Sequence, residues 1–374
     1  MTTTGVFGFS RAGPSDEPEI RRLVGSVPMS GSITVRFERE PDYFLGCSVM
    51  GDVCDVLLAR HDPGGELCGV VCRSERTLLV NGEERRVGSI GQVRVAPRYQ
   101  GTWLLHRGVR WFREHGAPDL LYTGVVAHDN ARARAVMLER RPPGELHARR
   151  LCGITTHALL LRRGQGGWGR RPRPSGIEVR GATGDQLDDL VAFLRRTGAR
   201  RQLFPAWSAE DFTGGQTLRD MTLDDVAVAR RDGSIVGVLG TWDQTAFKQD
   251  VVHAYPPAIA RLRPAWNAFA RVLAAPSLPG IGSAIPQAFA AFACVQDDDP
   301  EVMAMLLRRV ARRAAERGRG FLLLGLADDD PLARALGRWP RLTYHSDLFA
   351  FSWTEPDPGA DMDDRVPYVE IGTL

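Results

Sequence analysis

One pattern occurs twice in this chain of 374 residues, and the two copies keep the same order. Residues 55–70 read DVLLARHDPGGELCGV and residues 225–238 read DVAVARRDGSIVGV. Further along, residues 127–135 read AHDNARARA and residues 327–335 read ADDDPLARA. A chain that repeats two separated motifs at a similar spacing is expected to fold as two related halves. Because the copies are unequal, the repeat also indicates which half can keep a binding site.

The predicted elements follow the same order in the two halves: strand, helix, antiparallel hairpins, helix, strand, helix and strand. In the first half we predict a strand at Phe7–Arg11, a helix at Ser15–Val24, hairpins at Asp55–Arg60 with Glu66–Cys72 and at Thr77–Val80 with Arg86–Val95, a helix at Trp103–His115, a strand at Leu120–Ala127, a helix at Asn130–Glu139 and a strand at Ile154–Leu161. In the second half we predict a strand at Ile177–Arg180, a helix at Asp185–Arg196, a hairpin at 225–242, a strand at 290–295, a helix at 301–317, a strand at Phe321–Leu326, a helix at 331–337 and a strand at Tyr344–Phe351. This order implies an α+β fold of two domains, each a mixed, mostly antiparallel sheet flanked by helices.

The two halves are separated by residues 163–175, RGQGGWGRRPRPS, where glycine, arginine and proline show no periodicity. We therefore expect a first domain at 1–162, a linker at 163–175, a second domain at 176–355 and a C-terminal tail at 356–374. The tail begins as a polar spacer and ends in PYVEIGTL, which is expected to be strand-like.

Composition excludes several classes of partner. A net charge of +3 gives no case for a nucleic-acid partner. No apolar run approaches the ~20 residues that cross a bilayer, and the N-terminus has no secretory pattern.

The six cysteines show no paired CxxC spacing, which indicates reduced thiols, a cytoplasmic location and no metal site. Cys68 and Cys72 lie four apart on a predicted strand and are expected to share a face.

The most informative local stretch is Val93–Trp103, VRVAPRYQGTW. A strand ends here, a proline turn follows, and a helix begins. Unpaired backbone amides at such a helix start, together with the positive end of the helix dipole, form an anion site. Four arginines add positive charge near it, at positions 94, 98, 107 and 110. A pyrophosphate group suits this arrangement.

This stretch resembles the motif of the GNAT acyltransferase superfamily, a strand followed by Val-x-Pro-x-x-(Gln/Arg)-x-x-Gly-x-(Gly/Ala) and a helix. Val95, Pro97 and Gln100 match it. The family's Asn-x-x-Ala at a later helix start is matched by Asn130 and Ala133. The resemblance covers residues 6–162 in layout, and the second half repeats that layout to about residue 353.

The resemblance implies an acyl-CoA site in the first half, with acetyl-CoA or another acyl-CoA as the bound cofactor. The residues that it assigns to the cofactor are Val93, Val95, Arg98, Gln100, Gly101, Thr102, Trp103, Leu104, Leu105 and Asn130. Trp103 and Leu105 replace the family's small residues, which leaves room for a longer or atypical donor. Met137 stands where the family often has a tyrosine that protonates the leaving thiolate.

The second copy has lost this loop. Its equivalent segment, Val295–Pro300, contains no glycine and carries Asp297, Asp298 and Asp299 where the pyrophosphate would lie. A pair of like charges ~4 Å apart costs on the order of 4 kcal/mol at an effective dielectric near 20. We therefore expect one cofactor site, with the second half supporting it and supplying acceptor surface. A solvated helix cap explains the aspartates equally well.

Candidate catalytic groups come from two places. His128 closes a predicted strand beside the expected thioester and has a pKa suited to a base, and Tyr122 on the same strand could donate to the thiolate. A surface histidine and a core tyrosine are the alternatives. In N-myristoyltransferase, a tandem protein of the same superfamily, the terminal carboxylate is the base. By analogy the Leu374 carboxylate, or Glu370, could reach the first site, the alternative being an added edge strand.

Candidate substrate-binding residues fall in two segments. Residues 39–44 lie where the family places its acceptor-facing helix and loop, so that Glu40 or Asp42 could hold a cationic amine while Tyr43 and Phe44 form a wall. An ordinary helix start is the alternative. Residues 242–249 hold Trp242 and Lys248, which is the only lysine among 48 basic residues. An interdomain hydrogen-bond network explains this segment equally well.

Together these features predict an acyl-CoA-dependent N-acyltransferase, with acetyl-CoA as the expected donor. An amine, either a small molecule or a peptide, would attack the thioester directly. Two alternatives stay open: a non-catalytic CoA- or peptide-binding scaffold, and a tailoring acyltransferase that moves a longer acyl group to a peptide or carrier-bound natural product. We expect a monomer or homodimer, without a nucleic-acid or membrane partner.

Overall fold

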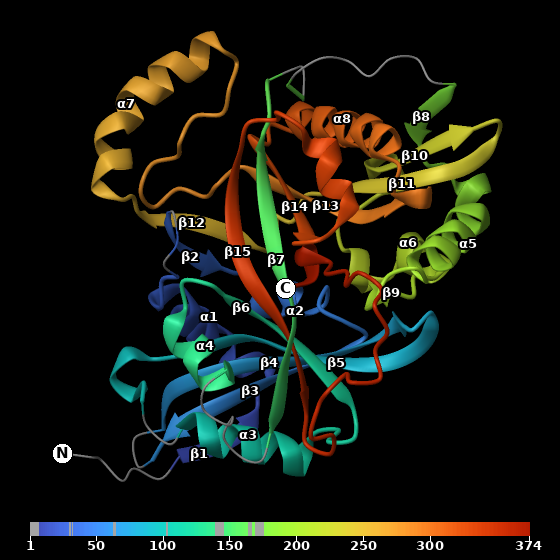
Figure 1. Ribbon diagram of the computed structural model, residues 1–374. Coiled ribbons are helices and arrows are strands. Elements are labelled where there is room, and N and C mark those ends of the chain that lie inside the picture. The colour runs from blue at the N-terminus through green and yellow to red at the C-terminus, as the bar shows by residue number, and fades with distance from the viewer. Residues whose placement is uncertain are drawn as a thin grey trace.

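The computed structural model describes residues 7–29, 31, 33–62, 65–101, 104–138, 146–163, 167–168 and 176–374. Most strands in this part of the chain belong to one mixed sheet that passes through both halves (Figure 1). In spatial order they are β1 (Phe7–Arg11), β3 (Val53–His61), β4 (Glu66–Val80), β5 (Glu83–Val95), β6 (Leu121–Ala127), β15 (Arg341–Ser352), β7 (His147–Leu160), β14 (Phe321–Ala327), β13 (Gln287–Val295), β11 (Ser234–Trp242), β10 (Val226–Arg231) and β8 (Ile177–Gly181). The predicted α+β class, with mostly antiparallel pairing, is confirmed.

The last strand of each half is inserted beside the other half. β15 pairs antiparallel with β6, and β7 pairs antiparallel with β14. These two long strands also pair with each other at the centre of the sheet, as the crossing ribbons in Figure 1 show. The strand order is therefore symmetrical about the β15–β7 pair, and neither half completes its sheet without a strand from the other. A second, two-stranded sheet joins the halves again through β2 (Thr34–Glu38) and β12 (Gln249–Ala254).

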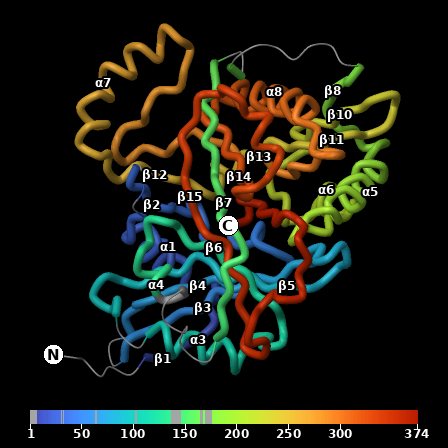
Figure 2. The backbone as a smooth tube through the Cα atoms, viewed as in Figure 1, coloured from blue at the N-terminus to red at the C-terminus, as the bar shows by residue number. Residues whose placement is uncertain are grey.

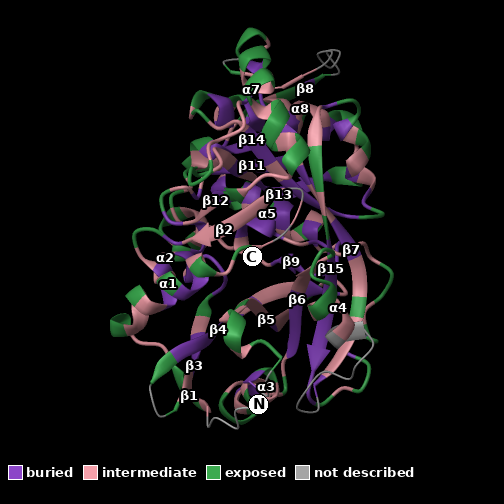
Figure 3. Ribbon diagram, turned by 90° about the vertical axis from the view of Figure 1, so that its left-hand side faces the viewer, coloured by how far each residue is buried: buried purple, intermediate pink, exposed green. Residues whose placement is uncertain are grey.

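Helices cover both faces of the sheet. In the first half, α1 (Glu17–Ser26) and α2 (Tyr43–Cys47) pack on one face, while α3 (Leu104–His115) packs on the other. The remaining helices are α4 (Ala131–Leu138), α5 (Leu187–Gly198), α6 (Ala209–Thr213), α7 (Pro257–Val272) and α8 (Pro300–Glu316). Buried residues follow the sheet through both halves in Figure 3, whereas α7 is largely exposed. No helix of the described part is long and apolar enough to cross a bilayer.

The sequence repeat corresponds to a structural repeat. The first motif of each copy forms an equivalent antiparallel hairpin, β3–β4 in the first half and β10–β11 in the second. The second motif of each copy begins a helical segment whose first turn is capped by a polar side chain. Asn130 accepts a hydrogen bond from the Ala133 amide, and Asp330 accepts one from the Leu332 amide. The shared spacing therefore reflects a capped helical start in both halves, although the segment after Asp330 is the 3-10 helix η8 (Pro331–Leu336) where an α-helix follows Asn130.

Several segments differ from the sequence-based expectation. The first-half strands predicted at 66–72 and 77–80 are one continuous strand, β4, because Arg73, Ser74 and Arg76 are buried within it and do not form a turn. The helix α7 lacks acidic residues in its first turn and contains Pro264, so its sequence carried weak helix signals. The tail does not end as a strand; Ile371–Thr373 form the 3-10 turn η9. Most of 163–175 lies outside the described residues.

The expectation that Cys68 and Cys72 share a face is wrong. The β3–β4 register shifts between Ala59 and Arg60, opposite Cys68, and this bulge reverses the alternation of side chains. Cys68 consequently packs with Leu104 of α3, while Cys72 packs beneath α1 and α2 on the opposite face.

A buried histidine in the central sheet makes stability depend on pH. His157 of β7 is 8% exposed, its Nδ1 has no hydrogen-bond partner in the described structure, and burial with nearby Arg341 lowers its pKa to about 4. The unfolded chain, with an ordinary histidine pKa near 6.5, takes up the proton first as pH falls. The free energy of unfolding should therefore fall as pH drops through the window from about 6.5 to about 4.

Urea unfolding of the native protein and a His157→Gln variant, at about pH 7 and about pH 5, measures this contribution. The variant should lose less of its free energy of unfolding over this interval than the native protein does. The exposed His253→Gln variant serves as control and should match the native protein. Equal acid sensitivity in the His157→Gln variant and the native protein would contradict the assignment.

Candidate active site

Strands β5 and β6 are paired over only part of their length and then separate. They pair in parallel from Val87 with Leu121 to Ser89 with Thr123, and no later residues of the two strands pair with each other. Just beyond this point β5 contains a bulge at Gln92, whose φ is +54°, and its register with β4 shifts. The backbone of β5 from Ile90 to Val95 therefore faces β6 without the parallel pairing of the earlier residues. An extended ligand can occupy such an opening by pairing with the strand.

The outer end of this opening leads to the predicted anion loop. After Val95 the chain forms the 3-10 turn Pro97–Tyr99 and then α3, which begins at Leu104. Gly101 has a φ of +85°, and a Cβ there would stand 2.7 Å from Arg132 Nη2. Arg132 also approaches Gln100 Oε1 at 3.5 Å, and Arg98 is paired with Glu66. The Arg132 guanidinium therefore lies directly beside Gly101, and Arg98, in the preceding turn, is held by a carboxylate.

The other predicted cofactor residues have different surroundings. Val93 and Leu105 are exposed, Leu104 is buried against Cys68, and the Asn130 side chain caps α4. Thr102 and Trp103 lie outside the described residues, as does the side chain of Met137.

His128 and Tyr122 are held by partners away from the inner end of the opening. His128 Nε2 lies 3.2 Å from Asp347 Oδ1, in a cluster with Arg134 and Arg150. Tyr122 is buried on the opposite face of β6 from Thr123, where its hydroxyl accepts from Arg73 Nε at 2.9 Å and donates to the Ala117 carbonyl. Neither side chain lines the pocket described below.

The second half contains the same parting of strands, but the chain's own tail occupies it. β13 and β14 pair in parallel only from Gln287 to Phe289, and β13 then bulges at Phe292, with a φ of +58°. Glu370 Oε2 accepts the Phe292 amide at 3.0 Å and the Tyr368 hydroxyl. A Cβ on Gly325 of β14 would stand 2.3 Å from Ile371, so the tail is seated closely against β14. The tail thus takes the position of a ligand in this half.

The three aspartates of the second loop are neutralised by arginines. Asp297 pairs with Arg200 at 2.7 Å, Asp298 pairs with Arg201, and Asp299 pairs with Arg231 at 3.1 Å. Asp299 also accepts the Glu301 and Val302 amides at the start of α8. The loop is therefore a helix cap whose carboxylates are paired with arginines, in line with the helix-cap alternative that the sequence left open.

From the second half, the tail carries Leu374 to the first half. Lys248 Nζ donates to the Leu374 oxygen at 2.8 Å and to the Gly372 carbonyl at 2.9 Å. Burial, reinforced by the Arg39 charge, lowers the pKa of Lys248 to about 7. A lysine in this state can bind or release a proton near neutral pH.

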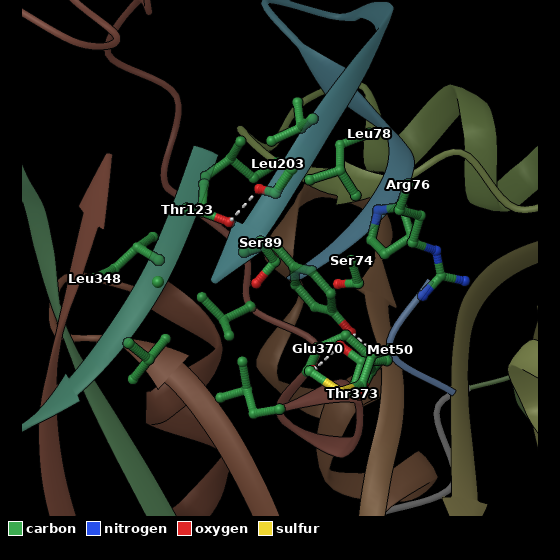
Figure 4. A pocket seen from close by; sticks show the side chains of 18 residues that line it. Met50, Ser74, Arg76, Leu78, Ser89, Thr123, Leu203, Leu348, Glu370 and Thr373 are labelled. Atoms are coloured by element: carbon green, nitrogen blue, oxygen red, sulfur yellow. Dashed lines mark hydrogen bonds between the residues drawn. The ribbon is translucent and has the colours of Figure 1, made fainter. Parts of the chain in front are cut away.

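A pocket of about 70 Å³ lies at the inner end of the β5–β6 opening (Figure 4). Its sheet side carries Ser74 and Arg76 of β4, Ser89 of β5 and Thr123 of β6. The tail residues Glu370, Thr373 and Leu374 close another side. The parted strands, the pocket and the end of the tail therefore form one continuous site.

Arg76 is the unusual member of this lining. It is 9% exposed, its Nη1 has no hydrogen-bond partner among the described residues, and its guanidinium lies 4.0 Å from the Trp207 ring centroid. Burial lowers its pKa. Sequence reasoning missed Arg76 and Ser74, because they fall in a segment that was predicted to separate two strands.

The predicted substrate-binding residues come from two segments, 39–44 in the first half and 242–249 in the second. Asp42 caps α2 by accepting the Phe44 amide, while Glu40 is half exposed and pairs with Arg21. Tyr43 is buried, with its hydroxyl 3.1 Å from Cys72 Sγ. Trp242 is fully buried; its Nε1 donates to the Arg219 carbonyl, and its ring packs against Gly372 of the tail. Of these residues, Lys248 is the one that contacts Leu374 directly.

Known structures share this fold. No protein-family model and no curated protein matches the sequence. A GCN5-related N-acetyltransferase from Sphaerobacter thermophilus superimposes with a TM-score of 0.56 and 14% identity over 98% of both chains. N-myristoyltransferase of Saccharomyces cerevisiae with bound myristoyl-CoA gives 0.58 and 11% over 97% of this chain and 89% of that one. The glucosamine N-acetyltransferase region of a fungal β-N-acetylglucosaminidase gives 0.58 and 15%, over 94% of this chain and 38% of that one. The chain therefore has the GNAT fold over nearly its whole length.

The tail should be held in the second half mainly through Glu370. Replacing it by alanine leaves the buried Phe292 amide without an acceptor, which costs roughly 1–3 kcal/mol of docking free energy. Carboxypeptidase should therefore remove C-terminal residues from a Glu370→Ala variant faster than from the native protein, as followed by mass spectrometry. Asp364→Ala, an exposed change in the same tail, should digest at the native rate. Equal digestion of all three proteins would argue against this anchor.

Proposed function

We propose that this protein is an acyl-CoA-dependent N-acyltransferase with one cofactor site, between β5 and β6 of the first half. The supporting observation is the separation of these strands between the Gly101 turn, with Arg132 beside it, and a pocket lined by Leu374. The pyrophosphate would bind at the loop through backbone amides, Arg98 and Arg132, and the pantetheine arm would pair with β5. The amine nitrogen attacks the thioester carbonyl carbon, the carbon–sulfur bond breaks, and the sulfur leaves as thiolate.

The size and lining of the pocket support a short acyl donor. Its volume is about 70 Å³, and hydroxyl groups of Ser74, Ser89 and Thr123 face it. An apolar cavity of ~150 Å³ holds a single benzene molecule, so a pocket half that size suits a small acyl group. We therefore propose acetyl-CoA or a similarly short acyl-CoA as the donor, and not a long-chain acyl-CoA.

The end of the tail supplies the proposed proton acceptor. Leu374 lines the pocket and its oxygen is held by the buried Lys248 ammonium or amine at 2.8 Å. We propose that the Leu374 carboxylate accepts the proton of the attacking amine and that Lys248 positions it. This geometry favours Leu374 over His128 and Tyr122, which are engaged elsewhere. Glu370 then acts as an anchor of the tail.

The second half serves the first in this proposal. Its own opening holds the tail, its Lys248 positions Leu374, and β12 pairs with β2 of the first half. The acceptor would be a small-molecule or peptide amine that enters between the halves. The division into domains at 1–162 and 176–355 remains part of this proposal, as does a cytoplasmic location.

Binding of CoA should stabilise the protein and depend on the glycine loop. Ligand at 100 times its dissociation constant adds ~2.7 kcal/mol to the free energy of unfolding, so acetyl-CoA should raise the melting temperature. The rise should shrink in a variant with Arg98→Ala and Gln100→Ala, which removes one guanidinium and the contact to Arg132. Arg180→Ala, at an exposed site in the second half, should retain it. No shift with any CoA ester would favour the scaffold alternative.

Deleting Thr373 and Leu374 should lower turnover without abolishing CoA binding. A positioned general base contributes ~10²–10⁴-fold to rate, and we expect a fall in kcat of that order. The acetyl-CoA-induced rise in melting temperature should persist, because the glycine loop is untouched. Leu374→Ala, which keeps the terminal oxygen, should retain most of the activity. Native turnover in the truncated protein would remove Leu374 as the base.

A further inference from the structure

Three cysteines from separate parts of the first half meet beneath α2. Cys47 belongs to α2, Cys54 to β3 and Cys72 to β4. Their Sγ atoms all lie within 4.8 Å of one another. Cys47 and Cys72 are buried, and Cys54 is partly exposed. Their separations of seven and eighteen residues match no familiar ligand spacing, so the sequence did not reveal the cluster.

The strand register explains how the three thiols converge. Cys54 lies opposite Ser74, and Cys72 lies opposite Val56, in the antiparallel β3–β4 pair. The two cysteines are therefore diagonal neighbours on the same face of the sheet. α2 packs across this face and places Cys47 as the third corner.

The triangle formed by the sulfur atoms of Cys47, Cys54 and Cys72 has the dimensions of a thiolate metal site. Three sulfurs that each lie ~2.3 Å from one ion are held ~4 Å apart, which is consistent with mutual distances below 4.8 Å. The Tyr43 hydroxyl lies 3.1 Å from Cys72 Sγ, beside the group. A disulfide can join only two of three thiols and would leave the third unpaired.

Two basic side chains lie beside the cysteine group. The buried Arg39 side chain and Lys248 lie close to α2; a Cβ on Gly46 would stand 2.9 Å from Arg39 Cδ and 3.4 Å from Lys248 Cγ. A thiolate is the form in which cysteine binds metal.

The other buried cysteines show what simple packing looks like in this chain. Cys68 packs with Ala59 and Leu104, and its thiol donates to the Ala59 carbonyl. Cys294 lies in the apolar core of the second half. Each acts as a small apolar side chain in the way that isolated buried cysteines do. The triangle differs from both because three sulfurs and a phenol face one another.

We propose that Cys47, Cys54 and Cys72 bind one thiophilic d¹⁰ cation, Zn²⁺ or Cu⁺, through three thiolates. These metals are the ones that thiolate ligands select among the biological divalent and monovalent ions. Each thiol releases its proton to solvent on binding, and the Tyr43 hydroxyl lies beside Cys72. The bound ion would tie α2 to β3 and β4. Since α2 packs against Lys248, the ion would also hold the residue that contacts Leu374.

The full-length protein, reduced and stripped of metal with a chelator under anaerobic conditions, provides the test. Cd²⁺ is titrated while thiolate-to-metal charge-transfer absorption is followed, and Zn²⁺ and Cu⁺ are then added as competitors. We expect one equivalent of Cd²⁺ to bind, to be displaced by at least one competitor, and to raise the melting temperature. Absence of a saturable band, or a band that neither competitor removes, overturns the proposal.

Cys54→Ser is the deciding variant, because Cys54 is the partly exposed member and its replacement should least disturb folding. Loss of a group that only supports a ligand lowers metal affinity ~10–100-fold, so loss of a ligand itself should cost at least as much. Cys68→Ser is the matched control and should bind Cd²⁺ like the native protein. Equal binding by Cys54→Ser and the native protein, or a disulfide within the triangle in the protein as purified, overturns the proposal.

Discussion

The exchange of final strands between the two halves underlies the rest of this structure. β15 completes the sheet of the first half and β7 completes that of the second, and the two strands pair with each other along the centre. Backbone groups on the exposed edge of a strand need hydrogen-bond partners. β6 of the first half obtains them from β15, and β14 of the second half obtains them from β7. Figure 2 shows β7 and β15 running side by side between the two halves, which this pairing joins into one sheet.

The joined sheet lets the second half carry the tail to the first half. Its parted strands, β13 and β14, hold the tail through Glu370 and Ile371, and the end of the tail then lies in the pocket of the first half. Lys248 of the second half contacts Leu374 and also lies against α2 of the first. One copy of the repeat thus supplies the strands that line the pocket, and the other holds the chain segment that closes it.

Much of the fold could be predicted because it rests on local pattern. The β3–β4 and β10–β11 hairpins, α3, α8 and the capped turns at Asn130 and Asp330 follow from apolar spacing and capping residues within short windows. The candidate site was harder to predict. Arg76 and Ser74 become pocket residues only because β4 continues past the point where a turn was expected, and the cysteine triangle depends on a strand register and a bulge.

By itself, the sequence determined that the chain folds as two related halves and that their loops differ, with three aspartates in the second. Repeats, capping residues and local charge are properties of neighbouring residues, so they can be read without a fold. Only the tertiary structure decided where the tail lies, which strands are exchanged and which thiols meet. These depend on contacts between residues such as Lys248 and Leu374, or Cys47 and Cys72, whose separation along the chain carries no periodic signal.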